Sequence, residues 1–405
     1  MWDYFDDDRC ILYFELLQKY RNEDLNLNVK TNTGANTVLS AAQHCRAKLI
    51  KWLIDNGADP FMIGGHDNSN AIDRAITVWP DKDPQARVEN VKVLLEAGLD
   101  IEITNPQSQT PLIAAAEVGA FDVVEFLLKK GADVNALTNE GENAICFAVK
   151  GNYDYQFTRT SEMNEQNKVR VINLLCEYGG NIDCISLDGL TPLGYSICFK
   201  YNQIFERLIE LGANINLKDS FGLTPLMRAL AYNNRNAKRT LLSQSNIDLT
   251  LEDENGQNIL FYLVREDDTT ENVAKFLKFV TNFKVPYTKN NFNEYPLFYA
   301  VEGKRHFTKK ILEINNDINC EDLKGATPLL IACGFYVDNA EDFNFNIQKE
   351  IIMMLIEKGA DINYKNTDGL TAMDIAERLN NSSLINFLIS KGAKPKRKIG
   401  FHHNI

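Results

Sequence analysis

Histidine and cysteine, the residues that most often act as catalysts or metal ligands, are few and scattered in this chain of 405 residues. The five histidines are His44, His66, His306, His402 and His403. The sequence contains no H-E-x-x-H or G-x-S-x-G motif, phosphate-binding loop, Rossmann glycine fingerprint or zinc-ligand spacing. We therefore predict a protein that is not an enzyme and that has no catalytic residues, metal site or cofactor.

Cysteine chemistry has equally little support, because none of the cysteines forms a C-x-x-C pair. The eight cysteines are Cys10, Cys45, Cys146, Cys176, Cys184, Cys198, Cys320 and Cys333. Most lie within helical patterns, so we expect reduced thiols that act as small core residues. The alternative is a metal or redox cluster formed by Cys176, Cys184 and Cys198.

A recurring sequence motif, which we call the phrase, defines the helices and turns that carry these residues. Thr110-Pro111-Leu112 is followed by Gly131-Ala132-Asp133-Val134-Asn135, and Thr191-Pro192-Leu193 by Gly212-Ala213-Asn214-Ile215-Asn216. The residue two positions before each Thr-Pro serves as a marker: Ser108 and Gly141 are 33 residues apart, as are Gly189 and Gly222. A fixed period of this length indicates one stacked array rather than several unrelated domains.

Each part of the phrase has a structural purpose. Threonine followed by proline suits the start of a helix, where the hydroxyl caps free amides and proline needs no N–H. Small residues such as Ala114-Ala115-Ala116 then allow a short first helix to pack closely against its neighbours. The apolar spacing of Val123, Val124, Phe126, Leu127 and Leu128 predicts a second helix, which Gly131 ends.

The whole pattern resembles the ankyrin repeat, a β-turn plus two antiparallel helices with the signature T-P-L-H-x-A. The resemblance implies an all-α solenoid of stacked helix-turn-helix units joined by β-turn or hairpin loops. We count ten units, with markers at Gly34, Asn68, Ser108, Gly141, Gly189, Gly222, Gly256, Asn293, Gly325 and Gly369. We expect an N-terminal capping helix and partial turn over 1–30, the array over 31–395, and a basic tail over 396–405.

The match to the family is incomplete in two respects. Asn143-Ala144-Ile145-Cys146 and Asn258-Ile259-Leu260-Phe261 stand where Thr-Pro-Leu-His belongs. The family histidine is also absent from the other units, where its position holds Ile113, Gly194, Met227, Phe298, Leu330 or Asp374. A polar network between repeats therefore lacks its usual imidazole, although the architecture is expected to be the same.

Three pairs of markers are too far apart and indicate insertions. Asn68 and Ser108 are 40 residues apart, Gly141 and Gly189 are 48 apart, and Gly325 and Gly369 are 44 apart. We place the insertions near 78–87, 152–167 and 335–347, between the two helices of their units. Their aromatic residues are candidate contacts for a partner: Tyr153, Tyr155, Phe157, Tyr336, Phe343 and Phe345. The alternative is that these rings fold back onto the array.

The charge of the chain narrows the choice of partner. A formal net charge of −12 argues against nucleic acid and anionic membranes as main partners. Residues 1–8 lack the features of a signal peptide, and no apolar stretch is long enough to cross a membrane. We therefore expect a cytoplasmic protein that is monomeric when free and binds another protein, plausibly a basic one.

The resemblance also suggests where that partner binds. Arrays of this family generally bind along a concave face made by turn tips and first helices. By analogy the candidate residues are Glu140, Glu142, Asp188, Phe199, Phe221, Tyr232, Glu254, Glu266, Phe292 and Glu294. Phe199, Phe221 and Tyr232 belong to adjacent units and have acidic neighbours, which is the composition of a hot spot for a basic partner. The alternative is that the rings only fill space between hairpins and helices.

The sequence thus favours a non-catalytic scaffold that captures another macromolecule. A narrower alternative is an immunity or inhibitor protein that occludes a cognate, basic toxin or enzyme, since acidic charge would steer such a partner. A third possibility is a secreted, host-directed effector that acts as an adaptor.

Overall fold

The computed structural model describes residues 7–21, 26–30, 34–44, 46–65, 68–77, 84–151, 165–314, 317–338 and 340–395. These residues form helices and no strand, apart from one isolated antiparallel bridge between Gly64 and Ser69. The prediction of an all-α fold is confirmed. The chain divides into two compact units: unit 1 comprises 1–220 and 234–243, and unit 2 comprises 221–233 and 244–405.

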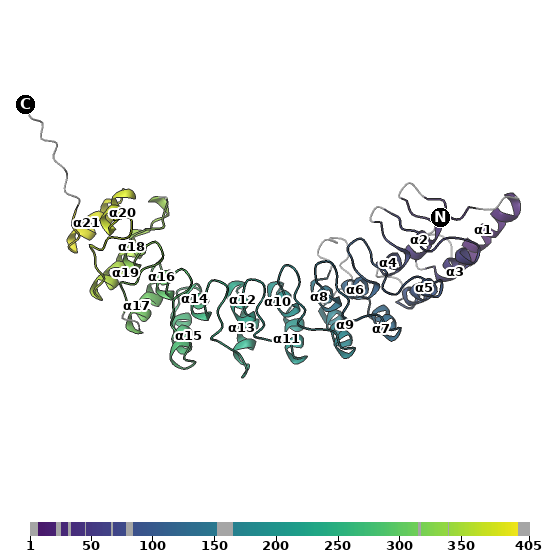
Figure 1. Cartoon of the computed structure of the whole chain (residues 1–405), viewed down its shortest axis with the longest axis horizontal. Coiled ribbons are helices and arrows are strands. Elements are labelled where there is room, and N and C mark those ends of the chain that lie inside the picture. The colour runs from purple at the N-terminus through teal and green to yellow at the C-terminus, as the bar shows by residue number, and fades with distance from the viewer. Residues whose placement is uncertain are drawn as a thin grey trace, which may run out of the picture. The chain divides into compact units, whose positions relative to one another are not determined.

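In unit 1 the helices form two stacked rows (Figure 1). The first row holds the first helix of each pair: α2 (Thr37–Gln43), α4 (Ala71–Ile76), α6 (Pro111–Glu117), α8 (Ala144–Lys150) and α10 (Pro192–Cys198). The second row holds α3 (Ala47–Asp55), α5 (Pro84–Glu96), α7 (Phe121–Lys129), α9 (Glu165–Glu177), α11 (Asn202–Glu210) and α13 (Arg235–Leu242). The expected N-terminal helix is α1 (Asp7–Arg21), which packs against α3.

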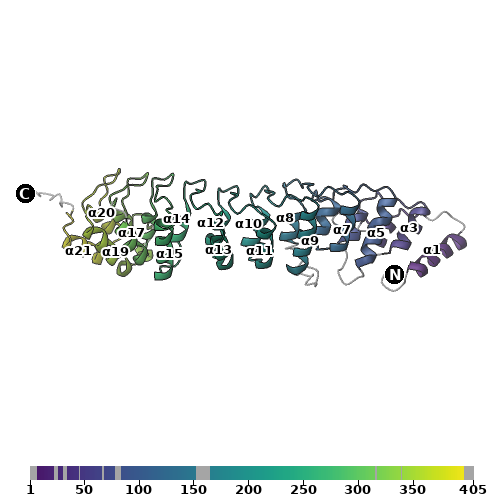
Figure 2. The ribbon, with the colours of Figure 1, turned by 90° about the horizontal axis from the view of Figure 1, so that it is seen from below.

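Unit 2 repeats the same arrangement. Its first helices are α12 (Pro225–Ala231), α14 (Ile259–Val264), α16 (Pro296–Ala300), α18 (Pro328–Ala332) and α20 (Ala372–Arg378). Its second helices are α15 (Thr270–Thr281), α17 (Arg305–Ile314), α19 (Phe345–Glu357) and α21 (Ser382–Ser390). Within each unit the hairpin loops that precede the first helices lie on one side of the rows (Figure 2).

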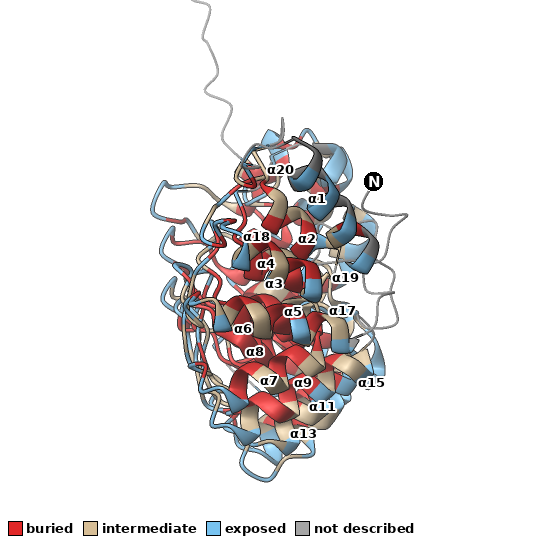
Figure 3. Ribbon diagram, turned by 90° about the vertical axis from the view of Figure 1, so that its right-hand side faces the viewer, coloured by how far each residue is buried: buried red, intermediate tan, exposed pale blue. Residues whose placement is uncertain are grey.

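The core of each unit lies between the two rows, where Figure 3 shows most of the buried residues. Ala114, Ala115 and Ala116 of α6 are buried, as expected for a short helix in close contact with its neighbours. In unit 2, the rings of Phe276 and Phe307 meet edge to face at 5.8 Å between α15 and α17. Within each unit, apolar contact between adjacent repeats therefore holds each row together.

Apart from α16, which follows Tyr295 without a side-chain cap, the first helices begin with threonine or asparagine. A capping threonine accepts a hydrogen bond through its hydroxyl from the third helical amide, as Thr191 does from Gly194 at 3.0 Å. At α2, α4, α8 and α14 asparagine is the capping residue. The Asn143 side-chain oxygen accepts from the amides of Ile145 and Cys146, each at 3.1 Å.

These asparagines also bond to the end of their own repeat. The Nδ2 atom of Asn143 donates to the Asn181 carbonyl at 2.8 Å, and that of Asn258 donates to the Pro286 carbonyl at 2.7 Å. The Nδ2 atom of Asn36 makes the same contact with the Asp59 carbonyl, at 2.9 Å. The degenerate phrases thus use a single amide to cap the first helix and to hold the turn after the second.

Asn143→Ala is expected to destabilise unit 1 by about 2–3 kcal/mol, because it leaves the Asn181 carbonyl and two helix amides without their partner. Thr110→Ala, which removes a single cap bond of 3.4 Å, should cost about 1 kcal/mol. Chemical denaturation followed by circular dichroism measures the difference. Equal shifts for the two variants would contradict the double role of Asn143.

The missing family histidine leaves an apolar interior at its position. Ile113, Met227, Phe298 and Leu330 are all buried there. Asp374 is different, since its carboxylate accepts from the Thr371 amide at 2.8 Å and completes a capping box at the start of α20. Polar contacts between repeats must therefore come from other positions.

The insertions are described in part. Residues 78–83 and 152–164 lie outside the described residues, and with them Tyr153, Tyr155 and Phe157. In the third insertion Phe343 is buried, and the Phe345 ring meets the Phe387 ring of α21 edge to face at 5.8 Å. Tyr336 is 41% exposed, and its hydroxyl bonds to Asp322. A short 3-10 helix, η2 (Ala340–Asp342), precedes α19 in this segment. Within the described ranges, no helix is long and apolar enough to cross a membrane.

Candidate partner-binding site

The hairpin loops that precede the first helices are organised by a polar residue three positions before the marker. In unit 2, the Asp253 Oδ1 atom accepts hydrogen bonds from the amides of Asn255 and Gln257, both at 2.8 Å. The equivalent side chains of Asn105, Asn290, Asp322 and Asn366 each accept two amide bonds in the same way. Each turn is therefore held in one conformation and presents its tip residues at fixed places.

Backbone hydrogen bonds also join neighbouring hairpins. In unit 1 the Leu187 amide donates to the Glu140 carbonyl at 2.7 Å. In unit 2 the Glu254 amide donates to the Phe221 carbonyl at 3.4 Å, and the Leu323 amide to the Phe292 carbonyl at 3.1 Å. The tips therefore form an ordered row rather than independent loops.

The row in unit 2 carries exposed apolar side chains. Phe221 is 58% exposed, Phe292 is 45% exposed and Leu323 is 69% exposed. Tyr232, in the turn that follows α12, is 46% exposed, and Glu254 is exposed as well. We call these five residues the tip surface. Apolar rings among acidic and polar groups have the composition of a protein-binding hot spot.

Phe199 lies in a different setting from the other two rings of the expected cluster. It belongs to unit 1 and is half-buried, with its ring centroid 6.1 Å from that of Tyr195 and 5.7 Å from that of Tyr201. Phe221 and Tyr232 belong to unit 2. The space-filling interpretation therefore describes Phe199, whereas Phe221 and Tyr232 present open surface.

The acidic candidates differ in how far they are exposed. Glu140, Asp188 and Glu254 are exposed at hairpins, where their charges can meet a partner. Glu266 and Glu294 are half-buried, whereas Glu142 is only 1% exposed. The charge of Glu142 is used inside the chain, so Glu142 forms no part of the surface that we assign to a partner.

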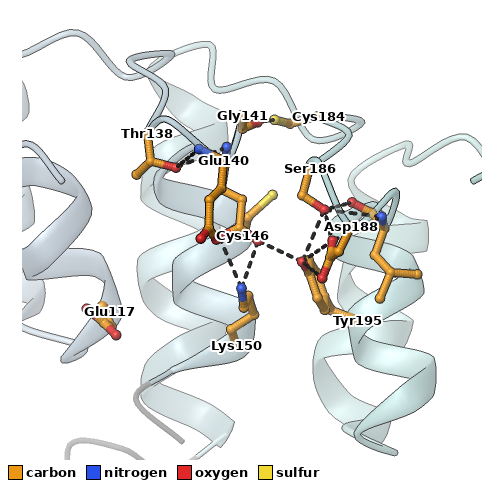
Figure 4. Close-up of polar contacts among 12 residues, drawn as sticks. Glu117, Thr138, Glu140, Gly141, Cys146, Lys150, Cys184, Ser186, Asp188 and Tyr195 are labelled. Atoms are coloured by element: carbon orange, nitrogen blue, oxygen red, sulfur yellow. Dashed lines mark hydrogen bonds and ion pairs between the residues drawn. The ribbon is translucent and has the colours of Figure 1, made fainter. Parts of the chain in front are cut away.

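Glu142 is the centre of a buried polar network between two repeats of unit 1, and Figure 4 labels its partners Lys150 and Tyr195 together with Ser186 and Asp188. Lys150 Nζ lies 2.8 Å from Glu142 Oε1, and the Tyr195 hydroxyl lies 2.6 Å from the same oxygen. That hydroxyl also lies 2.7 Å from Asp188 Oδ1 and 3.1 Å from the hydroxyl of Ser186, which hydrogen-bonds to Asp188. The Lys150 ammonium sits 5.0 Å from the centre of the Tyr195 ring. The network links α8 to α10 and to the hairpin before α10.

The electrostatics of the network favour a charged Asp188 carboxylate and a neutral Tyr195 phenol. Burial and the hydrogen bond to Glu142 raise the pKa of Tyr195 well above its usual range. Burial acts to raise the pKa of Asp188, but hydrogen bonds from Ser186 and Tyr195 outweigh it and lower that pKa. The phenol therefore remains a hydrogen-bond donor at neutral pH.

Unit 2 contains related tyrosine–carboxylate pairs. Tyr262 donates to Asp253 at 2.6 Å, and Tyr299 donates to Glu294 at 2.8 Å. Burial and the bond to Glu294 raise the pKa of Tyr299 to about 12. Tyr195, Tyr262 and Tyr299 all stand six positions after a marker. This recurrence is a signal in the sequence that a search limited to the family phrase misses.

The cysteines do not form the metal cluster considered from the sequence. Among the described residues, no group of three or more His, Cys, Asp or Glu side chains could hold a metal ion. The Cys184 thiol instead donates to the Gly141 carbonyl on the neighbouring hairpin, at 3.1 Å.

Comparison with known proteins agrees with these features. The model of ankyrin repeats matches the chain in three copies, over residues 85–155, 198–285 and 297–399. An ankyrin repeat protein of fowlpox virus is 30% identical over 156 residues, which is 36% of this chain and 41% of that protein. An ankyrin repeat protein of Acanthamoeba polyphaga mimivirus is 23% identical over 277 residues, which is 66% of this chain and 32% of that protein.

A third relative comes from a mammal. The mouse SH3 and multiple ankyrin repeat domains protein 1 is 30% identical over 141 residues, which is 35% of this chain and 6% of that protein. The chain spans less than half the length of each of these three relatives. The matched family segments, which cover more than half of the chain, together with the stacked helix pairs show that this protein belongs to the ankyrin-repeat family.

Proposed function

We propose that the chain is a non-catalytic scaffold that captures another protein on the tip surface of unit 2. The observation that carries this proposal is the exposure of Phe221, Phe292 and Leu323 on hairpins that backbone hydrogen bonds hold together. Ordered tips keep these side chains in place before binding, so little conformational entropy is lost when a partner docks. Ankyrin repeats generally mediate protein–protein interactions, which supports this use of the surface.

The charge of the chain supports a basic partner. The formal net charge is −12, and Glu254 lies exposed within the tip surface. Long-range attraction would accelerate encounter with a positively charged segment, and the exposed rings would then provide the apolar contact that slows dissociation. The cysteines among the described residues are thiols rather than disulfides, which supports a reducing compartment such as the cytoplasm. The proposal includes a monomeric free chain.

Affinity capture followed by a measured Kd tests the site. With the captured partner, Phe221→Ala and Phe292→Ala should each weaken binding at least tenfold, because aromatic hot-spot residues typically contribute more than about 1.4 kcal/mol. Neither variant should change the midpoint of unfolding appreciably, since both side chains are largely exposed. Binding should also weaken as salt rises.

Leu187→Ala is the matched control, because Leu187 is a tip residue of unit 1 that is 76% exposed. The control should bind with the affinity of the unaltered chain. If Leu187→Ala weakens binding and both phenylalanine variants bind normally, the partner engages a different part of the array. If the partner proves acidic and binding strengthens with salt, the charge argument fails.

A further inference from the structure

Two neighbouring hairpins of unit 1 present large apolar side chains to solvent. Leu137 is 58% exposed on the hairpin before α8, and Ile185 and Leu187 are 45% and 76% exposed on the hairpin before α10. Leu137 and Ile185 occupy equivalent places, four positions before the markers of their repeats. Exposed apolar side chains that are grouped in this way mark surfaces that other proteins cover.

Hydrogen bonds hold these two hairpins together as one surface. The Leu187 amide donates to the Glu140 carbonyl at 2.7 Å, and the Cys184 thiol donates to the Gly141 carbonyl at 3.1 Å. Figure 4 shows the two hairpins side by side, with Gly141 and Cys184 at their contact. The exposed side chains therefore keep their places before a partner arrives. The unit 1 hairpin surface consists of Leu137, Glu140, Ile185, Leu187 and Asp188.

The side-chain charges on these hairpins and on the one before them are all negative. Segments 98–110, 131–143 and 181–191 contain seven carboxylates and no lysine or arginine. Glu140 and Asp188 are exposed among the apolar side chains. The hairpins of unit 2 differ, because they carry the exposed lysines Lys289, Lys324 and Lys365. A field of one sign distinguishes the unit 1 hairpin surface from the tip surface.

The negative charge on these hairpins is largely left without a basic partner inside the chain. Of the seven carboxylates, Glu142 alone forms an ion pair with a lysine among the described residues. Glu102 Oε1 instead accepts from the Asp133 amide at 2.8 Å, and Asp183 Oδ1 accepts from the Asn214 amide at 2.9 Å. Burial and the charge of Asp133 raise the pKa of Glu102, against the hydrogen bond from the Asp133 amide. The carboxylates thus repel one another, and a cation from outside the chain would relieve that repulsion.

We propose that the unit 1 hairpin surface is a second protein-binding site, which takes a partner segment rich in lysine or arginine and in large apolar residues. The apolar side chains of the segment would cover Leu137, Ile185 and Leu187, and its cations would meet Glu140 and Asp188. The negative field disfavours an acidic segment or a nucleic acid. The site does not depend on the tip surface, because it lies in the other compact unit.

Titration of the full-length chain with labelled peptides tests the proposal. The probe is a short amphipathic peptide of lysine and leucine, and fluorescence anisotropy gives its Kd. Binding should weaken as salt rises. A peptide with glutamate in place of lysine should not bind, and one with serine in place of leucine should bind at least about tenfold more weakly. Equal affinity for the lysine and glutamate peptides would overturn the proposal.

Point variants show whether the peptide binds at the unit 1 hairpin surface. Leu187→Ala should raise the Kd of the lysine–leucine peptide about tenfold, and Glu140→Lys should raise it more at low salt than at high salt. Phe221→Ala in unit 2 is the first control. Glu125→Lys is the second, because it changes the net charge as Glu140→Lys does but lies on α7 of the second row. If either control raises the Kd as much as the hairpin variants, the peptide binds elsewhere and the proposal fails.

Hydrogen exchange gives an independent location for the peptide. Bound peptide should slow amide exchange in 137–141 and 183–190 and leave 252–257 and 289–294 unchanged. The unfolding midpoint of Leu187→Ala should equal that of the unaltered chain, because the side chain is largely exposed, so a weaker affinity cannot be assigned to unfolding. Protection confined to the hairpins of unit 2 would contradict the assignment of this surface.

Discussion

Glu142→Ala is expected to lower the free energy of unfolding of unit 1 by about 3 kcal/mol, because it removes one partner of a buried ion pair. Glu142 is 1% exposed and accepts hydrogen bonds from both Lys150 and Tyr195. Its loss leaves the Lys150 ammonium without its carboxylate and opens a cavity between two repeats. The Lys150 side chain is 27% exposed, so partial hydration keeps the cost at the lower end of the usual range.

Chemical denaturation of matched variants measures this effect. Tyr195→Phe should cost only about 1–2 kcal/mol, because it removes one hydroxyl and leaves Glu142 paired with Lys150. Glu125→Ala is the exposed control: Glu125 pairs with Lys129 at 2.8 Å on the surface of α7, and its loss should cost under about 1 kcal/mol. If Glu142→Ala shifts the unfolding midpoint no further than Glu125→Ala, the network adds nothing to the coupling of the repeats.

A double variant separates pairing from packing. Replacing both charged partners, as in Glu142→Leu with Lys150→Met, should destabilise unit 1 less than Glu142→Ala alone, because no unpaired charge is left behind. A double variant that is less stable than the single one would show that the charges themselves hold the repeats together.

Glu142 also shows where sequence reasoning reached its limit. The thirty-three-residue phrase predicts helices, caps and stop signals correctly, because these depend on neighbouring residues such as Thr191 and Gly194. The burial of Glu142 depends instead on Tyr195, which is 53 positions away in the next repeat of the same unit. An insertion separates the two, so local spacing gives no sign of the contact.

The exposed rings of the tip surface were easier to predict from the sequence than the half-buried position of Phe199. Phe221 and Phe292 stand beside markers, where the family analogy predicts exposure, and both are exposed. Phe199 follows the same analogy but is half-buried, because Tyr195 and Tyr201 flank it. The identity of the partner cannot be predicted from such local positions, because it depends on the chemistry of another molecule. The scaffold, inhibitor and effector hypotheses therefore all remain compatible with one fold.

Gly222→Ala is the second substitution with a large expected effect, because a methyl group there would collide with the neighbouring hairpin. A Cβ at Gly222 would lie 2.5 Å from the Glu254 nitrogen and 2.9 Å from the Asp253 carbonyl carbon. Both are backbone atoms that no side-chain rotation can move away. The hairpins must then separate, and the bond from the Glu254 amide to the Phe221 carbonyl is lost.

Gly369 provides a control with nearly the same backbone conformation. Its φ is +75°, against +73° for Gly222, but a Cβ at Gly369 would meet nothing within 4 Å. Gly369→Ala should therefore cost only the strain of a left-handed residue, about 1 kcal/mol. Gly222→Ala adds overpacking and a lost hydrogen bond, for a total of about 2–4 kcal/mol in unit 2.

The pair of glycine variants also tests whether hairpin order supports binding. If the tip surface is the partner site, Gly222→Ala should weaken binding at a temperature where the chain remains folded, because Phe221 and Glu254 no longer keep their register. Gly369→Ala should leave affinity unchanged. Hydrogen exchange of the Glu254 amide gives a direct measure, with faster exchange expected only in Gly222→Ala. Loss of affinity in both variants would point to global destabilisation rather than to the geometry of the tips.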